Sequence, residues 1–396
     1  MAAILEKPIY KKILEKASND SFLVTFWDGE EKAFNKGEPA FRLIFKKPLN
    51  TKKLVSDTTL TLAEAYMSGE LVIEGNIEKI IESIFSNKDS FLHQHKVLGK
   101  ISKIKSNTVK KSKEDISYHY DLGNDFYRLW LDETMSYSCA YFKTKEDTLY
   151  EAQMNKIHHT LKKLNLKPSQ TLLDIGCGWG YLIIEAAKFY QVKAVGITLS
   201  EEQYLETKKR IEENGLVGQV EVRLVDYREL SKEKMMFDRI VSVGMLEHVG
   251  QANIPIFMDE VDKLLKEKGV ALIHCITGLF ETEVNTFLGK YIFPGGYIPS
   301  VRELINHMSL HNFRIIDIES LRLHYYRTLQ HWIMNFEKNI DKVEKKFDDR
   351  FIRMWRLYLN ACAANFHIGN SDLYQFLISK GVNNELPTTR DYLYLL

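Results

Sequence analysis

Apolar and polar residues alternate with a regular rhythm from about residue 115 onwards. Five apolar runs of strand length are separated by stretches with helical spacing. The runs are TLLDIG (171–176), VKAVGIT (192–198), VEVRLVD (220–226), FDRIVSVG (237–244) and GVALIHC (269–275). Strands that alternate with helices form a mostly parallel sheet, so this pattern predicts a doubly wound, Rossmann-like α/β domain over residues 115–396. The last ninety residues show mainly helical patterns and many aromatic side chains.

The first ninety residues follow a different pattern. Short β-like runs, SFLVTFWDG (21–29) and FRLIFKK (41–47), precede two helical stretches, TLAEAYMSGE (61–70) and IEKIIESIF (77–85). This mixture predicts a small α+β domain over residues 1–90. It contains no motif with recognisable chemistry.

Between these regions lies a basic segment, predicted to span residues 91–114 as a linker or an amphipathic helix. Residues 91–113 hold seven lysines and no acidic residue, with Val97, Ile101 and Ile104 at helical spacing. One interpretation is a solvated linker. The other is a patch that contacts anionic lipid head groups, where each Lys contributes about 1 kcal/mol. No base-stacking aromatic pattern accompanies the lysines, so we expect no nucleic-acid partner.

Composition adds little about partners but restricts the class of protein. The chain of 396 residues is 45% hydrophobic and 27% charged, which is typical of two or three globular domains rather than of a disordered chain. Lys and Arg number 54 against 53 Asp and Glu, so the net charge indicates no partner. The first residues lack the apolar core of a signal peptide, and no run of about 18 apolar residues predicts a membrane-spanning helix.

The four cysteines are far apart and form no CxxC pair. This spacing argues against a disulfide framework and against a zinc site, and it is typical of proteins in a reducing cytosol. They are Cys139, Cys177, Cys275 and Cys362. We therefore expect a cytoplasmic protein that holds no metal.

A glycine-rich turn follows the first strand of the α/β region. In LLDIGCGWGYLIIEAAKFY (172–190), a strand ends at Asp174, glycines stand at 176, 178 and 180, and a helix begins. Glycines at such a turn allow positive φ and let the backbone approach a ligand closely. The spacing is GxGxG, whereas the dinucleotide fingerprint is GxGxxG. Asp174 stands where S-adenosylmethionine enzymes place an acid near the amino-acid part of the cofactor.

The next two strands continue this cofactor-type pattern. No acid ends the second strand, and Thr198, Ser200 and Gln203 offer polar contacts instead. The third strand ends at Asp226, which suits a hydrogen bond from an adenine amino group but serves equally well as a helix N-cap. The glycine turn after the first strand and the polar residues at the ends of the second and third strands together predict S-adenosylmethionine binding.

Two further strands end in titratable side chains. The fourth leads to Glu247 and His248, and the fifth carries His274 at its end. A Glu at a strand end is often a cap or an ion-pair partner, and a His there is often structural. Ligands bind at the carboxyl ends of strands in such sheets, so the convergence of Glu247 and His274 favours a functional site. His248 is secondary and shapes the cofactor pocket or caps the next helix.

Read together, the motifs resemble the cyclopropane-fatty-acyl-phospholipid synthase family and the related mycolic acid cyclopropane synthases. The matching stretches occur in the expected order between residues 115 and 385. They are SYHYDLGNDFYRLWLDETMSYSCAYF (117–142), LDIGCGWG (173–180), GITLSEEQ (196–203), VDYREL (225–230), MLEHVG (245–250), YIFPGGYIPS (291–300) and YLNACAANF (358–366). Residues 1–90 resemble that family's N-terminal lipid-binding domain weakly, which favours the phospholipid branch.

The resemblance implies methylene transfer from S-adenosylmethionine across a cis double bond of a phospholipid acyl chain. The alkene attacks the sulfonium methyl, a carbocation forms, and loss of a proton closes the ring. The implied base is a bound bicarbonate, held by five groups: Cys139, Glu247, His274, the backbone of Ile276, and Tyr325, which is adjacent to Tyr326. Glu247 on this view binds the bicarbonate and is not the base.

The resemblance also completes the candidate cofactor site, because Tyr137 and Ser138 contact the cofactor in that family. The candidate cofactor-binding residues are therefore Tyr137, Ser138, Asp174, Gly176, Cys177, Gly178, Gly180, Thr198, Leu199, Ser200, Gln203, Asp226 and Tyr227. Cys362 matches the family's active-site cysteine. It lies in an apolar helical stretch, however, and the chemistry needs no thiolate, which favours packing.

Three alternatives stand beside ring closure. The same carbocation yields a methyl-branched or methylene chain if it is lost or captured differently. A lipid carrier with a vestigial cofactor fold is disfavoured because the glycine turn and anion ligands are intact, and a small-molecule methyltransferase is disfavoured by the match over 117–142. We expect the protein to bind the bilayer reversibly from the cytoplasm, and the family resemblance implies a homodimer.

Overall fold

The computed structural model of the protein describes residues 2–87, 90 and 122–394. The basic segment predicted at 91–114 lies outside the described residues, so its boundaries and its role stay predictions. The chain divides into two compact units. The first takes the described N-terminal residues together with Asn285–Ile292 and Trp332–Asn370, and the second takes the described remainder.

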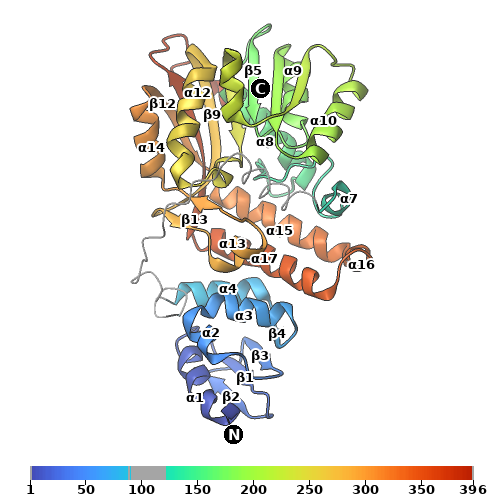
Figure 1. Cartoon of the computed structure of the whole chain (residues 1–396), viewed down its shortest axis with the longest axis vertical. Coiled ribbons are helices and arrows are strands. Elements are labelled where there is room, and N and C mark those ends of the chain that lie inside the picture. The colour runs from blue at the N-terminus through green and yellow to red at the C-terminus, as the bar shows by residue number, and fades with distance from the viewer. Residues whose placement is uncertain (1, 88–89, 91–121, 395–396) are drawn as a thin grey trace. The chain divides into compact units, whose positions relative to one another are not determined.

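The first unit contains a four-stranded mixed sheet in the order β2-β1-β3-β4 (Figure 1). β1 pairs antiparallel with β2 and parallel with β3, and β3 pairs antiparallel with β4. Aromatic residues dominate its core, with Phe22 stacked between Phe34 and Phe41. Its elements are α1 (Ala2–Leu14), β1 (Phe22–Thr25), β2 (Glu31–Phe34), β3 (Phe41–Phe45), α2 (Thr51–Ser56), α3 (Thr58–Met67), β4 (Leu71–Glu74), α4 (Ile77–Ser86), α13 (Thr286–Tyr291), α16 (Ile340–Glu344) and α17 (Asp349–His367).

The long helix α17 completes this unit, although it lies almost 300 residues along the chain from the sheet. It packs on α3 and α4. Its Trp355 and Leu359 are buried, and His367 at its end contacts Glu82 of α4 at 2.5 Å. The apolar face of α17 therefore depends on N-terminal helices for its cover.

The second unit contains a seven-stranded sheet in the order β12-β13-β9-β8-β5-β6-β7 (Figure 1). The five strands from β9 to β7 are parallel, which confirms the predicted doubly wound sheet. Its strands are β5 (Thr171–Ile175), β6 (Lys193–Thr198), β7 (Val220–Leu224), β8 (Phe237–Val243), β9 (Leu265–Gly278), β12 (Phe313–Ser320) and β13 (Ser371–Lys380), beside a short pair, β10 (Thr282–Glu283) and β11 (Tyr297–Ile298).

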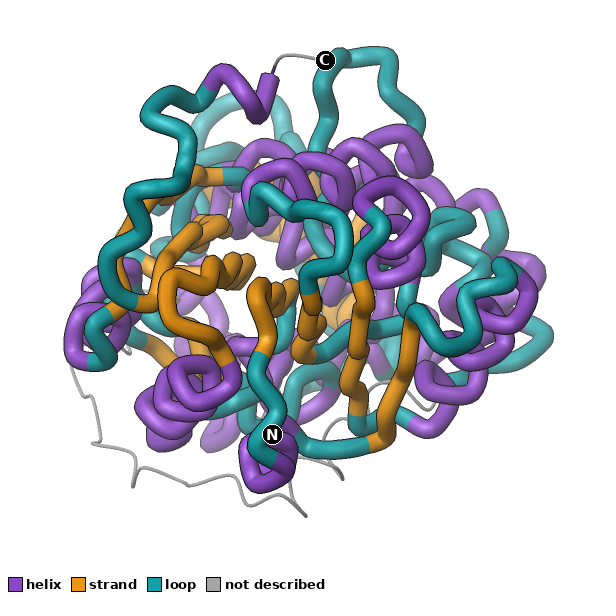
Figure 2. Tube along the Cα trace, turned by 90° about the horizontal axis from the view of Figure 1, so that it is seen from above, coloured by secondary structure: helices purple, strands orange, loops and turns teal. Residues whose placement is uncertain are grey.

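Helices cover both faces of this sheet (Figures 1 and 2). One buried cluster joins the sheet to α8 and α9, and another joins it to α11, α12 and α14. The helices are α7 (Asn124–Tyr127), α8 (Leu149–Lys163), α9 (Tyr181–Tyr190), α10 (Glu201–Glu213), α11 (Tyr227–Leu230), α12 (Ile254–Leu264), α14 (Val301–Leu310) and α18 (Asp391–Tyr394), with 3₁₀ turns η2 (Ser231–Glu233), η3 (Leu246–His248) and η4 (Gln251–Asn253). Helix α15 (Arg322–Lys338) contributes residues to both units.

Two antiparallel strands complete the sheet, and the sequence pattern did not predict them. β13 pairs antiparallel with β9 on one side and with β12 on the other. Its segment Leu373–Ser379 is buried apart from Tyr374, so the strand reads as an apolar run rather than as an alternation. Such a run does not distinguish a strand from a buried helix.

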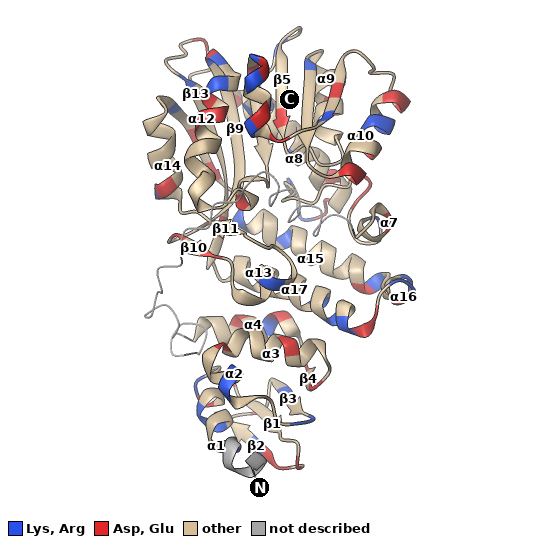
Figure 3. Cartoon of the chain, in the orientation of Figure 1, with Lys and Arg blue, Asp and Glu red and all other residues tan. Residues whose placement is uncertain are grey.

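Charge is distributed in keeping with the net balance of the chain. Figure 3 shows residues of both signs interspersed along α10. Among the described residues, no helix is long and apolar enough to cross a bilayer. The same residues contain no group of three or more His, Cys, Asp or Glu side chains placed to hold a metal ion.

Candidate active site

The glycine turn lies between β5 and α9, at the carboxyl end of the parallel sheet. Gly176, Gly178 and Gly180 have φ of +86°, +55° and +80°, in the left-handed region that favours glycine. A Cβ on Gly176 would lie 2.9 Å from Cγ of Met245, whereas a Cβ on Gly178 would meet nothing within 4 Å. The backbone at Gly178 therefore faces open space, as a ligand-binding turn requires.

A pocket opens at this turn and extends across the ends of β6, β7 and β8. It is lined by most of the predicted cofactor residues, namely Tyr137, Ser138, Asp174, Gly176, Cys177, Gly178, Thr198, Leu199, Gln203, Asp226 and Tyr227. Gly180 and Ser200 do not line it. Gly180 instead precedes the first turn of α9, and Ser200 is buried and caps α10 by accepting from the N–H of Gln203.

The polar residues at the ends of β6 and β7 also form local contacts. Thr198 donates from Oγ1 to Oε1 of Gln203 at 2.7 Å. Asp226 caps α11 by accepting from the N–H of Arg228, and its carboxylate pairs with the Arg228 guanidinium at 2.7 Å. The structure thus shows the capping role of Asp226, and its adenine contact stays a prediction.

Several pocket residues were not predicted from the sequence. They include Thr134, Met135, Ser136, Lys156, Trp179, Arg228 and Met245, and His248 lines the pocket as well. Burial lowers the pKa of His248 to about 4, so this ring is neutral at physiological pH. Trp179 lies inside the glycine motif and was recognisable there. Lys156 belongs to a helix that carries no motif, and its only signal is a lysine on a face that is otherwise buried.

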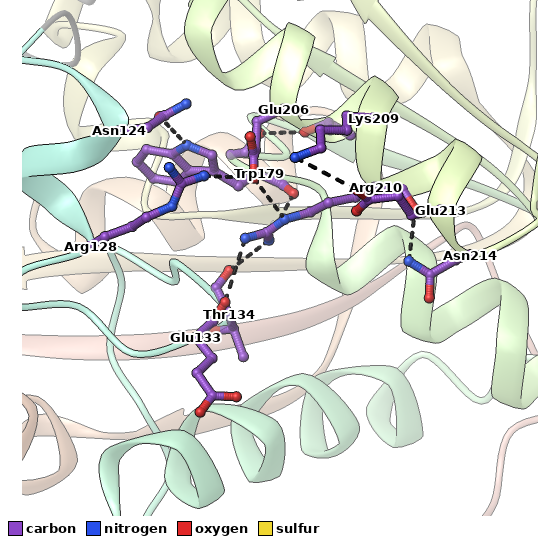
Figure 4. A network of polar contacts seen from close by, with 12 residues as sticks. Asn124, Arg128, Glu133, Thr134, Trp179, Glu206, Lys209, Arg210, Glu213 and Asn214 are labelled. Carbon is purple, nitrogen blue, oxygen red and sulfur yellow. Dashed lines mark hydrogen bonds and ion pairs between the residues drawn. The ribbon is translucent and has the colours of Figure 1, made fainter.

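A polar network fixes the segment 124–138 along one side of the pocket (Figure 4). The indole N–H of Trp179 donates to Asn124 at 2.7 Å, and Arg210 donates to the carbonyls of Thr134 and Trp179. Arg128 pairs with Glu206 of α10 at 2.8 Å. These contacts hold Tyr137 and Ser138 beside the glycine turn.

Glu247 and Ile276, two of the predicted anion ligands, are in direct contact. The N–H of Ile276 donates to Oε1 of Glu247 at 2.7 Å. The other oxygen, Oε2, is buried and has no partner among the described residues. Burial raises the pKa of Glu247 to about 7. The resemblance assigned the N–H of Ile276 to the anion, but here this N–H donates to Glu247. Oε2 of Glu247 is left without a hydrogen bond from the described residues.

His274 lies two residues before Ile276 on β9, so the two share a face of the strand. Its Nδ1 is 3.2 Å from Nε2 of Gln375 on β13, and its Nε2 has no partner in the described part of the chain. Gln375 is fully buried and also donates to Thr160. Burial lowers the pKa of His274 well below its usual value. A neutral ring that accepts at Nδ1 carries its proton on Nε2.

Cys139 and Tyr325, two further predicted anion ligands, both contact the backbone carbonyl of Leu321. The Cys139 thiol is fully buried, and its Sγ is 3.8 Å from the carbonyl of Leu321, which precedes α15. Tyr325 is half-buried in the first turn of α15, where its N–H donates to that same carbonyl. Burial raises the pKa of the Cys139 thiol, so it acts as a neutral group.

Cys362 does not belong to this set of residues. It lies on α17 in the first compact unit and does not line the pocket. Burial raises the pKa of its thiol to about 12, which argues against a thiolate. Its match to the family's cysteine is therefore not accompanied by the environment of a reactive thiol.

Known proteins resemble this chain both in sequence and in fold. A mycolic acid cyclopropane synthetase family model matches residues 107–376, and a domain of unknown function matches residues 9–96. Mycolic acid cyclopropane synthase CmaA1, solved with SAH and CTAB, superposes with a TM-score of 0.64 at 35% identity and covers 68% of this chain and 98% of that one. Coclaurine N-methyltransferase shares the fold alone, with a TM-score of 0.64 at 18% identity.

Two curated relatives match almost the whole chain. The cyclopropane-fatty-acyl-phospholipid synthase of Escherichia coli K12 is 37% identical over 366 residues, 90% of this chain and 92% of that protein. A probable fatty acid methyltransferase of Pseudomonas putida is 35% identical over 385 residues, 93% of this chain and 95% of that protein. The fold and pocket thus define an S-adenosylmethionine-dependent methyltransferase. Within that class, the chain belongs to the mycolic acid cyclopropane synthetase family.

Proposed function

We propose that this protein is a cyclopropane-fatty-acyl-phospholipid synthase, which adds a methylene across a cis double bond of a phospholipid acyl chain. The observation that carries the proposal is the match to the Escherichia coli synthase, because it extends over 90% of the chain and includes the N-terminal region. The mycolic acid relatives align with only about two thirds of the chain.

The residues of the pocket fit S-adenosylmethionine. When bound, this cofactor supplies a methyl group that its sulfonium has already activated, so the protein needs no nucleophile of its own. The open backbone at Gly178 and the unsatisfied Oδ1 of Asp174 are features that a polar ligand would complete. Tyr137 and Ser138 close the same side of the pocket. The chain's task is to exclude water and orient the acceptor.

We further propose that a bound bicarbonate accepts the proton that ring closure releases. Supporting this, Glu247 Oε2 and His274 Nε2 are buried polar atoms without partners in the described chain. Buried polar atoms are normally satisfied, so a small polar ligand that contacts them would remove a free-energy cost. Cys139, Ile276 and Tyr325 are the remaining proposed ligands. The neutral His274 would donate from Nε2, and Glu247 would orient the anion.

A second candidate is a lipid C-methyltransferase that yields a methyl-branched or methylene chain. The specific observation in its favour is the match to the probable fatty acid methyltransferase of Pseudomonas putida, which covers 93% of this chain. Both candidates use the same cofactor pocket. They differ in whether the proton loss closes a ring.

The proposed substrate lies in a bilayer, so we propose a cytoplasmic protein that binds the membrane peripherally and reversibly, as a homodimer. Two copies on one surface would bind it more tightly than one through avidity. The lysines of residues 96–113 are the proposed contact with anionic head groups, because a surface potential attracts clustered lysines.

The test is to incubate the protein with vesicles of a cis-unsaturated phospholipid, S-adenosylmethionine and bicarbonate, and to analyse the acyl chains. Mass spectrometry reports the gain of one CH₂, and gas chromatography separates cyclopropane from branched isomers. A cyclopropane product supports the synthase. A branched or methylene product of the same mass supports the second candidate.

The control reaction uses Gly178→Val, whose pocket is expected not to take the cofactor. A product that forms equally with this variant, although the variant binds no S-adenosylhomocysteine, would mean that the activity comes from a contaminant. No mass gain by a chain that binds S-adenosylmethionine would contradict both lipid candidates.

A further inference from the structure

Lys156 is a buried cation on the wall of the cofactor pocket. It lies on α8, is 4% exposed and lines the pocket beside Ser138. Its Nζ donates to Oγ of Ser138 at 3.0 Å. Among the described residues, no carboxylate lies within ion-pair distance of this ammonium. Lys156 therefore presents a charge to the pocket without an acidic partner from the described chain.

Lys163, on the same helix, is a buried lysine with carboxylate partners and serves as a comparison for Lys156. It lies two turns further along α8 and is fully buried. Its Nζ pairs with the carboxylates of Glu319 and Asp317. A buried charge is normally paired in this way, because an unpaired one costs several kcal/mol. Lys156 instead interacts with the carboxyl groups of Asp132 and Asp174 only beyond ion-pair distance, so a ligand carboxylate would supply the direct ion-pair partner that it lacks.

Asp174 presents a carboxyl group to the same pocket. It ends β5, is 3% exposed, and forms no hydrogen bond or ion pair with the described residues. Lys156 acts on it electrostatically, yet the two are not in ion-pair contact. The pocket thus presents a buried lysine and a buried carboxyl group, neither in an ion pair with the described residues, whereas Asp226 and Arg228 in the same lining pair with each other. A ligand that carries both an ammonium and a carboxylate would satisfy the two groups together.

We propose that Lys156 binds the α-carboxylate of the methionine part of the cofactor, while Asp174 faces its α-amino group. The inference rests on the cofactor half of the proposed function and not on the lipid substrate. Ser138, which shares a hydrogen bond with Lys156, positions the ammonium at the pocket wall. Lys156 is then a cofactor-binding residue, supplied by a helix that no cofactor motif covers.

The experiment uses calorimetric titration of the full chain with three ligands that differ in the charged groups of the amino-acid end, and it compares the variant with the parent for each ligand, because the charge on the sulfur also differs between them. S-adenosylhomocysteine carries both charged groups, the decarboxylated form of S-adenosylmethionine lacks the carboxylate, and 5′-methylthioadenosine lacks both. Lys156→Met should weaken S-adenosylhomocysteine binding by about 10- to 100-fold, the range for a lost hydrogen bond to a charged group. Its affinity for the other two ligands should stay within about twofold.

Two controls separate this result from damage to the fold. Lys162→Met changes a half-exposed lysine on the same helix that does not line the pocket, and it should leave all three affinities unchanged. Asp174→Asn should weaken the two ligands that carry an amine and spare 5′-methylthioadenosine. An equal loss of affinity for all three ligands in Lys156→Met, or no loss for any, would overturn the proposal.

The unmodified protein provides a test that needs no variant to fold. Its affinity for decarboxylated S-adenosylmethionine should be at least tenfold below that for S-adenosylmethionine, and equal affinities would overturn the proposal. None of these measurements uses a lipid. A chain that binds the cofactor in this way but makes no cyclopropane would contradict the proposed lipid chemistry and leave the assignment of Lys156 intact.

Discussion

The acid–base chemistry of Glu247 depends on its buried surroundings. It is buried on the 3₁₀ turn η3 and receives one backbone N–H, which is too little to offset the loss of water. Burial therefore raises the pKa of its carboxyl to about 7, so both protonation states are accessible near neutral pH. A group of this kind suits the binding of a small anion, because its protonated form does not repel a negative charge.

Glu247→Gln should lower turnover by about 10²–10³-fold, the range seen when one polar group that supports a reacting centre is removed. Glu247 does not line the cofactor pocket, so the dissociation constant for S-adenosylhomocysteine should change little. Steady-state kinetics and titration calorimetry measure the two effects. Unchanged turnover would contradict the anion site, and lost cofactor binding would mean that the variant disturbs the pocket.

The raised pKa of Glu247 also predicts that the free energy of unfolding of the parent protein depends on pH in a way that Glu247→Gln does not share. The folded pKa of Glu247 is about 7 and the ordinary value is 4.5, so the folded chain keeps a proton that the unfolded chain has lost between these values. Raising the pH through this window therefore destabilises the parent relative to Glu247→Gln, by about 3 kcal/mol in total. Denaturant unfolding of both proteins from pH 4.5 to 8 measures the difference. A difference that does not vary with pH would contradict the raised pKa.

Single residues also show how far the sequence could predict the site. Most motif residues line the pocket, because the motif consists of residues that favour the local backbone conformation a ligand requires. Ser200 and Asp226 cap helices, a role that the same side chains perform without any ligand. Lys156 was missed because its role comes from burial, which depends on packing far along the chain.

At the scale of elements, the glycine turn and the antiparallel strands differ in how much of their structure is local. The turn between β5 and α9 follows from glycine conformation, so three glycines were enough to predict it. β13 is a strand because it finds partners on both sides, β9 and β12. Such pairing with distant residues leaves little trace in the residues of β13 themselves, which explains why the pattern did not predict it.

Gly178→Val should abolish cofactor binding, because its side chain would occupy the open space that the turn presents to the ligand. The matched control is Gly215→Val. Gly215 has φ of +66°, also has nothing within 4 Å of its Cβ position, and does not line the pocket. Both variants should lose about 1–2 kcal/mol of stability from backbone strain, but only the first should lose binding of S-adenosylhomocysteine by calorimetry. Retained binding in Gly178→Val would contradict the assigned role of the turn.

At the scale of the molecule, neither compact unit is a continuous piece of chain. The chain passes from one unit to the other five times, and the first unit takes both Asn285–Ile292 and Trp332–Asn370 from the later part of the sequence. The predicted domains, 1–90 and 115–396, were each a continuous range. Their boundaries stay predictions, but α17 within the second range packs on α3 and α4 of the first.

A fragment of residues 115–396 should therefore be less stable than the full chain. It lacks α3 and α4, and it exposes apolar surface of α17 that those helices cover. Each large apolar side chain that becomes exposed costs about 1.5–3 kcal/mol, so we expect a melting temperature at least about 10 °C lower, together with binding of an apolar dye. Binding of S-adenosylhomocysteine reports whether the second unit remains folded. A fragment that melts like the full chain and binds no dye would contradict this dependence.

Because the first unit is discontinuous in sequence, it cannot fold completely until late in synthesis on the ribosome. Its sheet is complete once β4 has left the exit tunnel, but α17 is not synthesised until residue 367. At about 5–20 residues per second, the N-terminal helices wait on the order of ten seconds to a minute for that partner. During this time α3 and α4 lack the cover that α17 later provides, so their apolar face stays accessible to chaperones until that helix has been made.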